Sequence, residues 1–186
     1  MKYLLSILTF FLSFSVIVLS QDFANKGTWE LGGSVGFTGT TPVFAGKVST
    51  SNAISVFTFS PEASYFITDN FEVGLKPLSL MFINSNDQTT EFSFLIAPAY
   101  NFELKRHIYP YIQALIGYGI ASSGAYSASG FDFGIQGGVK IVVAKSSVLN
   151  FGLSYLMTNR TPSGTTDRYG YNIIQLVAGF SVFITQ

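Results

Sequence analysis

The stretch GTWELGGSVGFT, residues 27–38, decides the fold of this chain because large apolar residues alternate in it with small or polar ones. Successive side chains of a strand point to opposite faces, so this alternation of period two predicts a β-strand. The large apolar residues of one face are Trp29, Leu31, Val35 and Phe37. The opposite face carries Glu30, Gly32, Ser34 and Gly36. One apolar and one polar face are typical of a barrel wall between lipid and a polar lumen.

The same alternation recurs along the chain and predicts eight strands. We expect them at residues 27–38, 53–67, 71–83, 90–103, 108–121, 130–143, 148–158 and 171–184. Three connections between them are short: 68–70, 104–107 and 144–147. The others are mostly longer and rich in Ser, Thr, Asn and Gly: 39–52, 84–89, 122–129 and 159–170. Outer-membrane barrels have short periplasmic turns and longer outside loops. We therefore predict an all-β fold, an eight-stranded antiparallel up-and-down transmembrane β-barrel, in a single domain over residues 21–186.

Residues 1–20 predict a signal peptide that is cleaved after Ser20. Lys2 precedes an apolar run over residues 4–19, and Val18 and Ser20 suit the small positions before a cleavage point. The run is shorter than the roughly 20 residues that a membrane-spanning helix needs. An uncleaved helical anchor is the alternative interpretation.

The composition supports a membrane location without helical spans. Charged residues form 11% of the chain, against about 25% in ordinary soluble domains. Hydrophobic residues reach 48%, yet beyond the leader no apolar run is long enough for a helical span. Low charge of this kind favours a transmembrane barrel. The formal net charge of zero predicts no binding of nucleic acid, and the absence of cysteine excludes disulfides.

Three prolines lie well inside the predicted strands: Pro61, Pro77 and Pro98. Each removes one donor from the ladder of strand hydrogen bonds. We expect bulges or locally open ladders there. Beyond Pro77 the register is open, so that Leu78, Leu80 and Phe82 can lie on either face.

Residues 60–74, SPEASYFITDNFEVG, resemble the strand–turn–strand of small OmpA/OmpX-like outer-membrane barrels, especially those of Bacteroidetes-type bacteria. Residues 109–119 resemble the fifth strand of that family, and residues 175–183 its closing strand. The resemblance implies an outer-membrane β-barrel domain that the barrel-assembly machinery inserts. Family members often end on an aromatic residue. Here the last aromatic is Phe183, three residues before the end, which implies a weaker assembly signal.

Five charged residues fall on the polar face of the predicted strands: Glu30, Glu62, Glu72, Lys76 and Lys140. An eight-stranded barrel is just wide enough to be filled by its own side chains, and charges in a dry interior must be paired. We therefore predict a lumenal charge network that plugs the barrel. The alternative is a gate, in which an exchange of partners opens a narrow water path.

The sequence offers no catalytic constellation. His107, the only histidine, lies in a short turn that we place in the periplasm. Catalysis by this residue would need a nucleophile and an orienting carboxylate within hydrogen-bond reach. One histidine and no cysteine also give no basis for a zinc site. We predict no enzymatic activity, no metal site and no cofactor.

Three cations fall in the predicted outside loops and are candidate contacts for lipopolysaccharide phosphates: Lys47, Arg160 and Arg168. The expected location is the bacterial outer membrane. The expected role is structural or surface contact, namely membrane stabilisation, or adhesion or defence through the outside loops. The alternatives are a narrow pore for small solutes and a soluble periplasmic lipocalin-like binder with the two faces reversed. The expected partners are outer-membrane lipid, lipopolysaccharide, the assembly machinery and a host or surface ligand, and we expect a monomer.

Overall fold

The structure is a computed structural model of the chain. It describes residues 23–44, 47–48, 54–83, 88–104, 107–123, 126–164 and 166–185. The predicted signal peptide, residues 1–20, lies outside the described residues.

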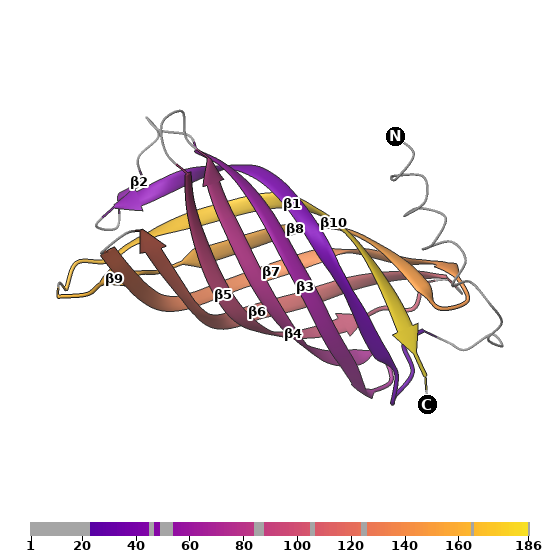
Figure 1. Cartoon of the computed structure of the whole chain (residues 1–186). Helices are drawn as coiled ribbons and strands as arrows, with labels where there is room; N and C mark the ends of the chain where they lie inside the picture. The colour runs from indigo at the N-terminus through magenta and orange to yellow at the C-terminus, as the bar shows by residue number, and fades with distance from the viewer. Residues whose placement is uncertain are drawn as a thin grey trace, which may run out of the picture.

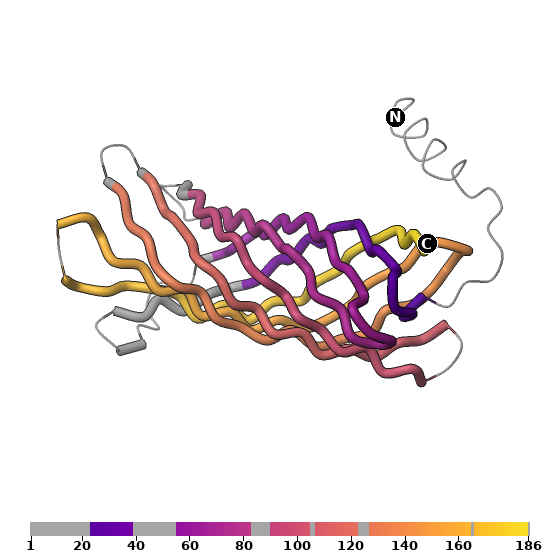
Figure 2. Tube along the Cα trace, turned by 90° about the horizontal axis from the view of Figure 1, so that it is seen from below, coloured from indigo at the N-terminus to yellow at the C-terminus, as the bar shows by residue number. Residues whose placement is uncertain are grey.

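Eight long antiparallel strands wrap around one axis and close into a barrel (Figures 1 and 2). They are β1 (Trp29–Phe44), β3 (Ile54–Thr68), β4 (Phe71–Ile83), β5 (Gln88–Asn101), β6 (Ile108–Ser123), β7 (Tyr126–Ala144), β8 (Ser147–Thr158) and β10 (Tyr169–Ile184). Two strands of two residues, β2 (Lys47–Val48) and β9 (Thr161–Pro162), pair with β1 and β7. The long strands pair in chain order, and β10 pairs with β1 to close the barrel. The predicted eight-stranded up-and-down barrel is confirmed.

The two ends of the barrel differ in their connections. At one end, which we call the turn end, short connections join β3 to β4, β5 to β6 and β7 to β8. The opposite end, which carries β2 and β9, is called the loop end, and the C-terminus lies away from it at the turn end (Figure 1). Several strands extend further toward the loop end than predicted; β7, for example, begins at Tyr126 rather than at Gly130. These extensions escape the hydropathy pattern because ladder hydrogen bonds continue where the side chains no longer alternate.

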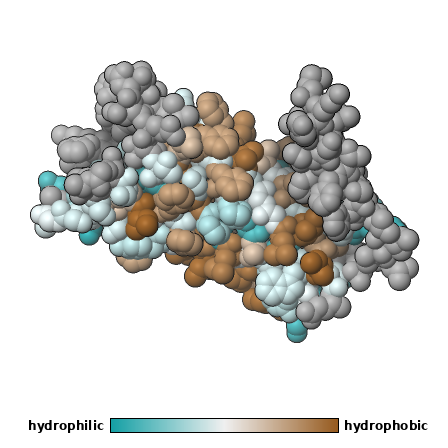
Figure 3. Space-filling model, in the orientation of Figure 1, coloured by the Kyte–Doolittle hydropathy of each residue, from teal (hydrophilic) through white to brown (hydrophobic). Residues whose placement is uncertain are grey.

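Large apolar side chains point outward along the whole wall. Leu176 is 73% exposed and Phe94 is 69% exposed, whereas Ser93 and Ser154 on the opposite face are 1% exposed. Apolar residues cover much of the visible wall between the two ends (Figure 3). The reversed faces that a soluble lipocalin-like binder requires are therefore not observed. The described residues contain no helix that is long and apolar enough to span a membrane.

The prolines open the ladder without changing its register. Pro61 on β3 and Pro77 on β4 fall at opposing positions, and the pairs Phe59↔Ser79 and Ala63↔Leu75 on either side keep one register. The pairing of β5 with β6 is interrupted in the same way around Pro98. Beyond Pro77 the alternation continues, so three apolar side chains stay on the face of Lys76 and lie buried in the lumen: Leu78, Leu80 and Phe82.

Four groups of side chains fill the lumen, two toward the turn end and two toward the loop end. The first is an apolar plug, made of Phe23, Ala24, Phe66, Tyr109, Val148 and Phe183. The second, the inner charge layer, contains the five predicted lumenal charges. The third is an apolar layer, made of Val56, Leu78, Leu80, Phe82, Leu95, Ala97, Leu115, Leu156 and Ile173. The fourth is a second group of charges near the loop end, the outer charge cluster, made of Glu91, Asp132 and Arg160. It lies beside the apolar layer, since Glu91 pairs with Leu80.

Candidate functional site

The inner charge layer is formed by side chains that the period of the strands turns inward. β1, β3, β4 and β7 contribute its members, which are Glu30, Glu62, Glu72, Lys76 and Lys140. The structure brings all five together inside the barrel, so the predicted residues share one site. Both lysines are nearly fully buried, with 3% and 4% exposed.

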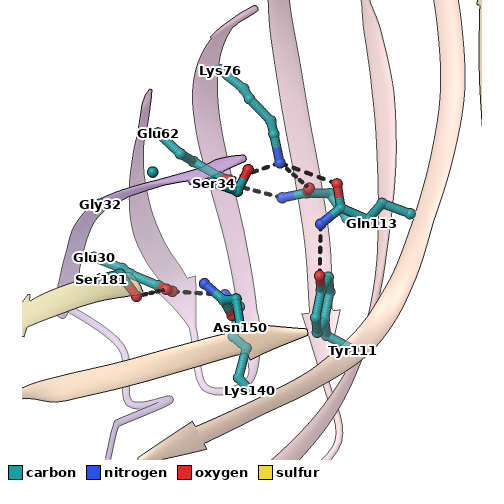
Figure 4. Close-up of a pocket in the computed structure, with 12 residues that line it drawn as sticks. Glu30, Gly32, Ser34, Glu62, Lys76, Tyr111, Gln113, Lys140, Asn150 and Ser181 are labelled. Atoms are coloured by element: carbon teal, nitrogen blue, oxygen red, sulfur yellow. Dashed lines mark hydrogen bonds and ion pairs between the residues drawn. The ribbon is translucent and has the colours of Figure 1, made fainter. Parts of the chain in front are cut away.

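Two lysines hold three carboxylates in this layer. The Lys140 Nζ lies 2.6 Å from Glu30 Oε2 and 2.5 Å from Glu72 Oε1, so one ammonium bridges two acids. The Lys76 Nζ lies 3.0 Å from Glu62 Oε2 (Figure 4). Lys140 also lies 5.3 Å from the ring centre of Phe23, where the π face of the ring favours a cation. The bridging lysine thereby ties the inner charge layer to the apolar plug below it.

Neutral polar side chains complete the hydrogen bonds of the layer. The Lys76 Nζ donates to Gln113 Oε1 at 3.3 Å and to Gln136 Oε1 at 3.2 Å. Gln113 Nε2 donates to Glu62 at 2.7 Å, and Gln136 Nε2 donates to Tyr111 Oη at 2.6 Å (Figure 4). Buried charges are tolerated when such bonds replace those of water. These partners share the inward period of the charges, so the sequence pattern could have included them.

Little free volume remains around these groups. A cavity lined by Glu30, Glu62, Lys76 and Lys140, among others, has a water-accessible volume of about 20 Å³. That is room for about one water molecule. The inner charge layer therefore fills the barrel at its level instead of lining an open channel.

The outer charge cluster is centred on a single guanidinium. Arg160 Nη1 lies 2.5 Å from Asp132 Oδ1 on β7, and Arg160 Nε lies 3.1 Å from Glu91 Oε2 on β5. Arg160 Nη2 also donates to Ser93 Oγ at 3.2 Å. Arg160 and Asp132 are 0% exposed. A planar guanidinium suits this task because its five donors fan out toward several acceptors at once.

The burial of Arg160 corrects the sequence prediction that this residue contacts lipopolysaccharide from an outside loop. The connection from β8 to β10 folds back, because Arg160 and Tyr169 exchange two backbone hydrogen bonds and β9 pairs with β7. Glycine makes room for the side chain, since a Cβ at Gly119 would overlap Arg160 Nη2. The missed signal was Glu91 and Asp132, two inward acids near the loop end that had no predicted partner.

The other predicted loop cations have different outcomes. Lys47 lies in β2, and its side chain is outside what the structure describes. Arg168 is exposed and lines a groove on the outer wall, so its contact with lipopolysaccharide stays a prediction. His107 is exposed in the turn between β5 and β6. Within the described part of the chain, no three His, Asp or Glu side chains are grouped closely enough to hold a metal ion.

Comparisons with known proteins show which class of fold the chain has. No protein-family model matches the chain, and no curated protein matches it. Among solved structures, Neisserial surface protein A matches with a TM-score of 0.60 at 15% identity, over 84% of this chain and 97% of that one. The outer membrane protein OprG from Pseudomonas aeruginosa matches with a TM-score of 0.59 at 11% identity, over 89% of this chain and 99% of that one.

A third match is the outer membrane protein AlkL, with a TM-score of 0.61 at 14% identity, over 92% of this chain and 96% of that one. At these identities the likeness concerns the fold. The chain has the fold of the small eight-stranded transmembrane barrels, which is the fold that the OmpA/OmpX-like resemblance implies.

Proposed function

We propose that this protein is an integral outer-membrane barrel with a structural or surface-contact role, and that its lumen conducts no solutes. The turn end then faces the periplasm and the loop end faces outward, as in barrels with short periplasmic turns. Membrane stabilisation would come from the barrel body, and adhesion or defence from the loop end.

The observation that carries this proposal is the filled lumen above the inner charge layer, where the apolar layer packs beside the outer charge cluster. Val56, Leu80 and Ile173 in this layer are 0% exposed, and Leu95 and Leu156 are 2% and 1% exposed. A hydrated ion would have to lose its water to pass such a layer, at a cost of several kcal/mol. The inner charge layer below it adds a second closure, because each lysine is already held by carboxylates. This arrangement favours the plug over the gate.

Single-channel recording in planar bilayers tests the closed lumen. We expect no openings from the purified full chain, while a general porin in the same bilayers opens. A useful matched variant hollows the apolar layer by the combined changes Leu80→Ala, Leu95→Ala and Leu156→Ala. Unitary openings of the unmodified protein would overturn the proposal.

A deletion strain tests the role itself. We expect its outer membrane to admit a large antibiotic more readily, or its cells to adhere less, and the full chain should restore the lost property. A variant with residues 49–53 replaced by Gly and Ser separates the two roles. Rescue of permeability by this variant assigns the role to the barrel body, whereas failure to rescue adhesion assigns it to the loop end. A deletion that changes neither property contradicts both roles.

A further inference from the structure

A groove of about 320 Å³ lies on the outer wall at the loop end, where β7, β8 and β10 meet. Its apolar walls are Phe131 and Phe133 of β7 and Met157 of β8, which are 60%, 47% and 43% exposed. Its remaining lining includes three polar side chains: Asn159, Arg168 and Asn172. The groove is thus apolar on one side and polar on the other.

The groove crosses the level at which the wall changes from apolar to polar. The register pairs Phe133 with Met157, and Met157 with Asn172, so these residues lie side by side on the three strands. On each strand an outward apolar residue is followed, toward the loop end, by an outward polar one. These pairs are Phe131 and Ser129 on β7, Met157 and Asn159 at the end of β8, and Ile174 and Asn172 on β10. Such a change marks the boundary between hydrocarbon and headgroups.

Arg168 brings a positive charge to this boundary. It is exposed, lines the groove and has no ion-pair partner among the residues that the structure describes. The neighbouring acid, Asp167, is exposed but does not line the groove. A guanidinium in this position offers paired donors that match the oxygens of a phosphate.

We propose that this groove binds a phosphorylated glycolipid of the outer leaflet, with an acyl chain against Phe131, Phe133 and Met157 and a phosphate on Arg168. The assignment rests on the proposed function, because it requires the loop end to face outward. A free anion would leave the apolar floor uncovered, and an uncharged lipid would leave Arg168 without a counterion. An amphiphile with a phosphate at its headgroup satisfies both parts of the groove.

Native mass spectrometry of the purified full chain tests the site. The protein is offered equal concentrations of diphosphorylated lipid A, dephosphorylated lipid A or phosphatidylglycerol, and the retained lipid is counted. We expect the wild type to retain diphosphorylated lipid A best. The charge-removing change Arg168→Gln should lower this retention about tenfold, which corresponds to the loss of one charge-assisted hydrogen-bond pair. Heat-modifiable gel mobility checks that each variant is folded.

Two further variants separate the parts of the groove. Asp167→Asn is the matched control, and it should retain as much lipid A as the wild type or more. Met157→Trp fills the groove and leaves Arg168 in place, so it should lower retention of the phosphorylated lipid as well. Unchanged retention by Met157→Trp overturns the acyl-chain part of the proposal.

Several results overturn the phosphate site. These are equal retention by the wild type and Arg168→Gln, equal retention of the dephosphorylated lipid, or a loss in Asp167→Asn as large as that in Arg168→Gln. Preferential retention of phosphatidylglycerol overturns the assignment to a glycolipid. If the barrel stays closed in planar bilayers but retains no lipid A, the result contradicts the lipid site and leaves the proposed function intact. If the barrel conducts and still retains lipid A, the result contradicts the proposed function and leaves the lipid site intact.

Discussion

The inner charge layer and the outer charge cluster both pair charges that are buried in the lumen, but they use different parts of the chain to do so. In the inner layer every charge stands on a long strand, and the period of two turns it inward. In the outer cluster the two acids stand on β5 and β7, but the cation comes from Arg160, in the connection after β8. The inner layer is therefore a property of the wall. The outer cluster depends on a connection that folds back into the barrel mouth.

The charge balance of the two groups is similar. The inner layer has three carboxylates for two lysines, and the outer cluster has two carboxylates for one arginine. Loss of a cation from either group leaves buried carboxylates facing each other, which costs more than the loss of an exposed ion pair. The comparison predicts that damage to the inner layer affects the whole barrel, and that damage to the outer cluster affects the connection first.

The largest effect is expected for Lys140→Met, because both Glu30 and Glu72 then lose their buried cation. The free energy of unfolding in lipid vesicles, measured with urea, should fall by about 3–5 kcal/mol. The exposed Lys145 provides the control, and Lys145→Met should stay within about 0.5 kcal/mol of the wild type. A Lys140→Met barrel as stable as this control would mean that the inner layer does not hold the wall together.

A smaller and more local effect is expected for Arg160→Gln, since the glutamine amide can still donate to Asp132 or Glu91. Unfolding should become easier by about 2–3 kcal/mol. Hydrogen exchange should also accelerate at the amides of Arg160 and Tyr169, which bond to each other's carbonyls. The exposed Arg168 gives a matched arginine, and Arg168→Gln should change neither quantity. Slow exchange retained in Arg160→Gln would show that the backbone alone holds the connection in place.

The third prediction concerns the space that receives Arg160. In Gly119→Ala the new methyl group would overlap Arg160 Nη2, so the guanidinium must shift from its place between Asp132 and Glu91. We expect a loss of about 1–3 kcal/mol, typical of overpacking. Gly137→Ala is the control, since a Cβ there meets nothing closer than the Tyr111 carbonyl at 3.6 Å. Equal stability of the two variants would indicate that the outer cluster rearranges freely.

The smallest effect is expected for Ser181→Ala. The Ser181 hydroxyl donates to Glu30 Oε1 at 2.5 Å, and its loss leaves Glu30 with the Lys140 bond (Figure 4). Removal of one such bond to a charged acceptor should cost about 1–2 kcal/mol in urea unfolding. The change Ser122→Ala, at an exposed position on β6, serves as the reference. A larger loss than that of Lys140→Met would reverse the ranking of the partners of Glu30.

The sequence predicts what repeats with a period of two, and little else. Glu30 and Lys140 could be placed in one lumen because each is flanked on its strand by outward apolar residues. Arg160 could not be placed, since no periodicity applies to a connection that turns back on itself. The same limit applies to Leu80: its inward position is apolar, so hydropathy gave no sign of which face it takes. The contact between Phe23 and Lys140 is likewise set by a segment before the first strand.

The layered filling of the lumen has a consequence for barrel assembly. A strand that slides by two residues keeps every side chain on its proper face. The difference in polarity between the lipid-facing and lumenal faces therefore does not disfavour this wrong register. A slip of two residues does become unfavourable where inward side chains change from charged to apolar along one strand, as on β4 between Lys76 and Leu78. If β4 slid by two residues toward the turn end, Leu78 would stand opposite Glu62 and the level of Leu78 would receive Leu80. Glu62 would then face the apolar side chain of Leu78 in place of Lys76, and Lys76 would enter the crowded position of Gly74, so such a misaligned barrel is disfavoured.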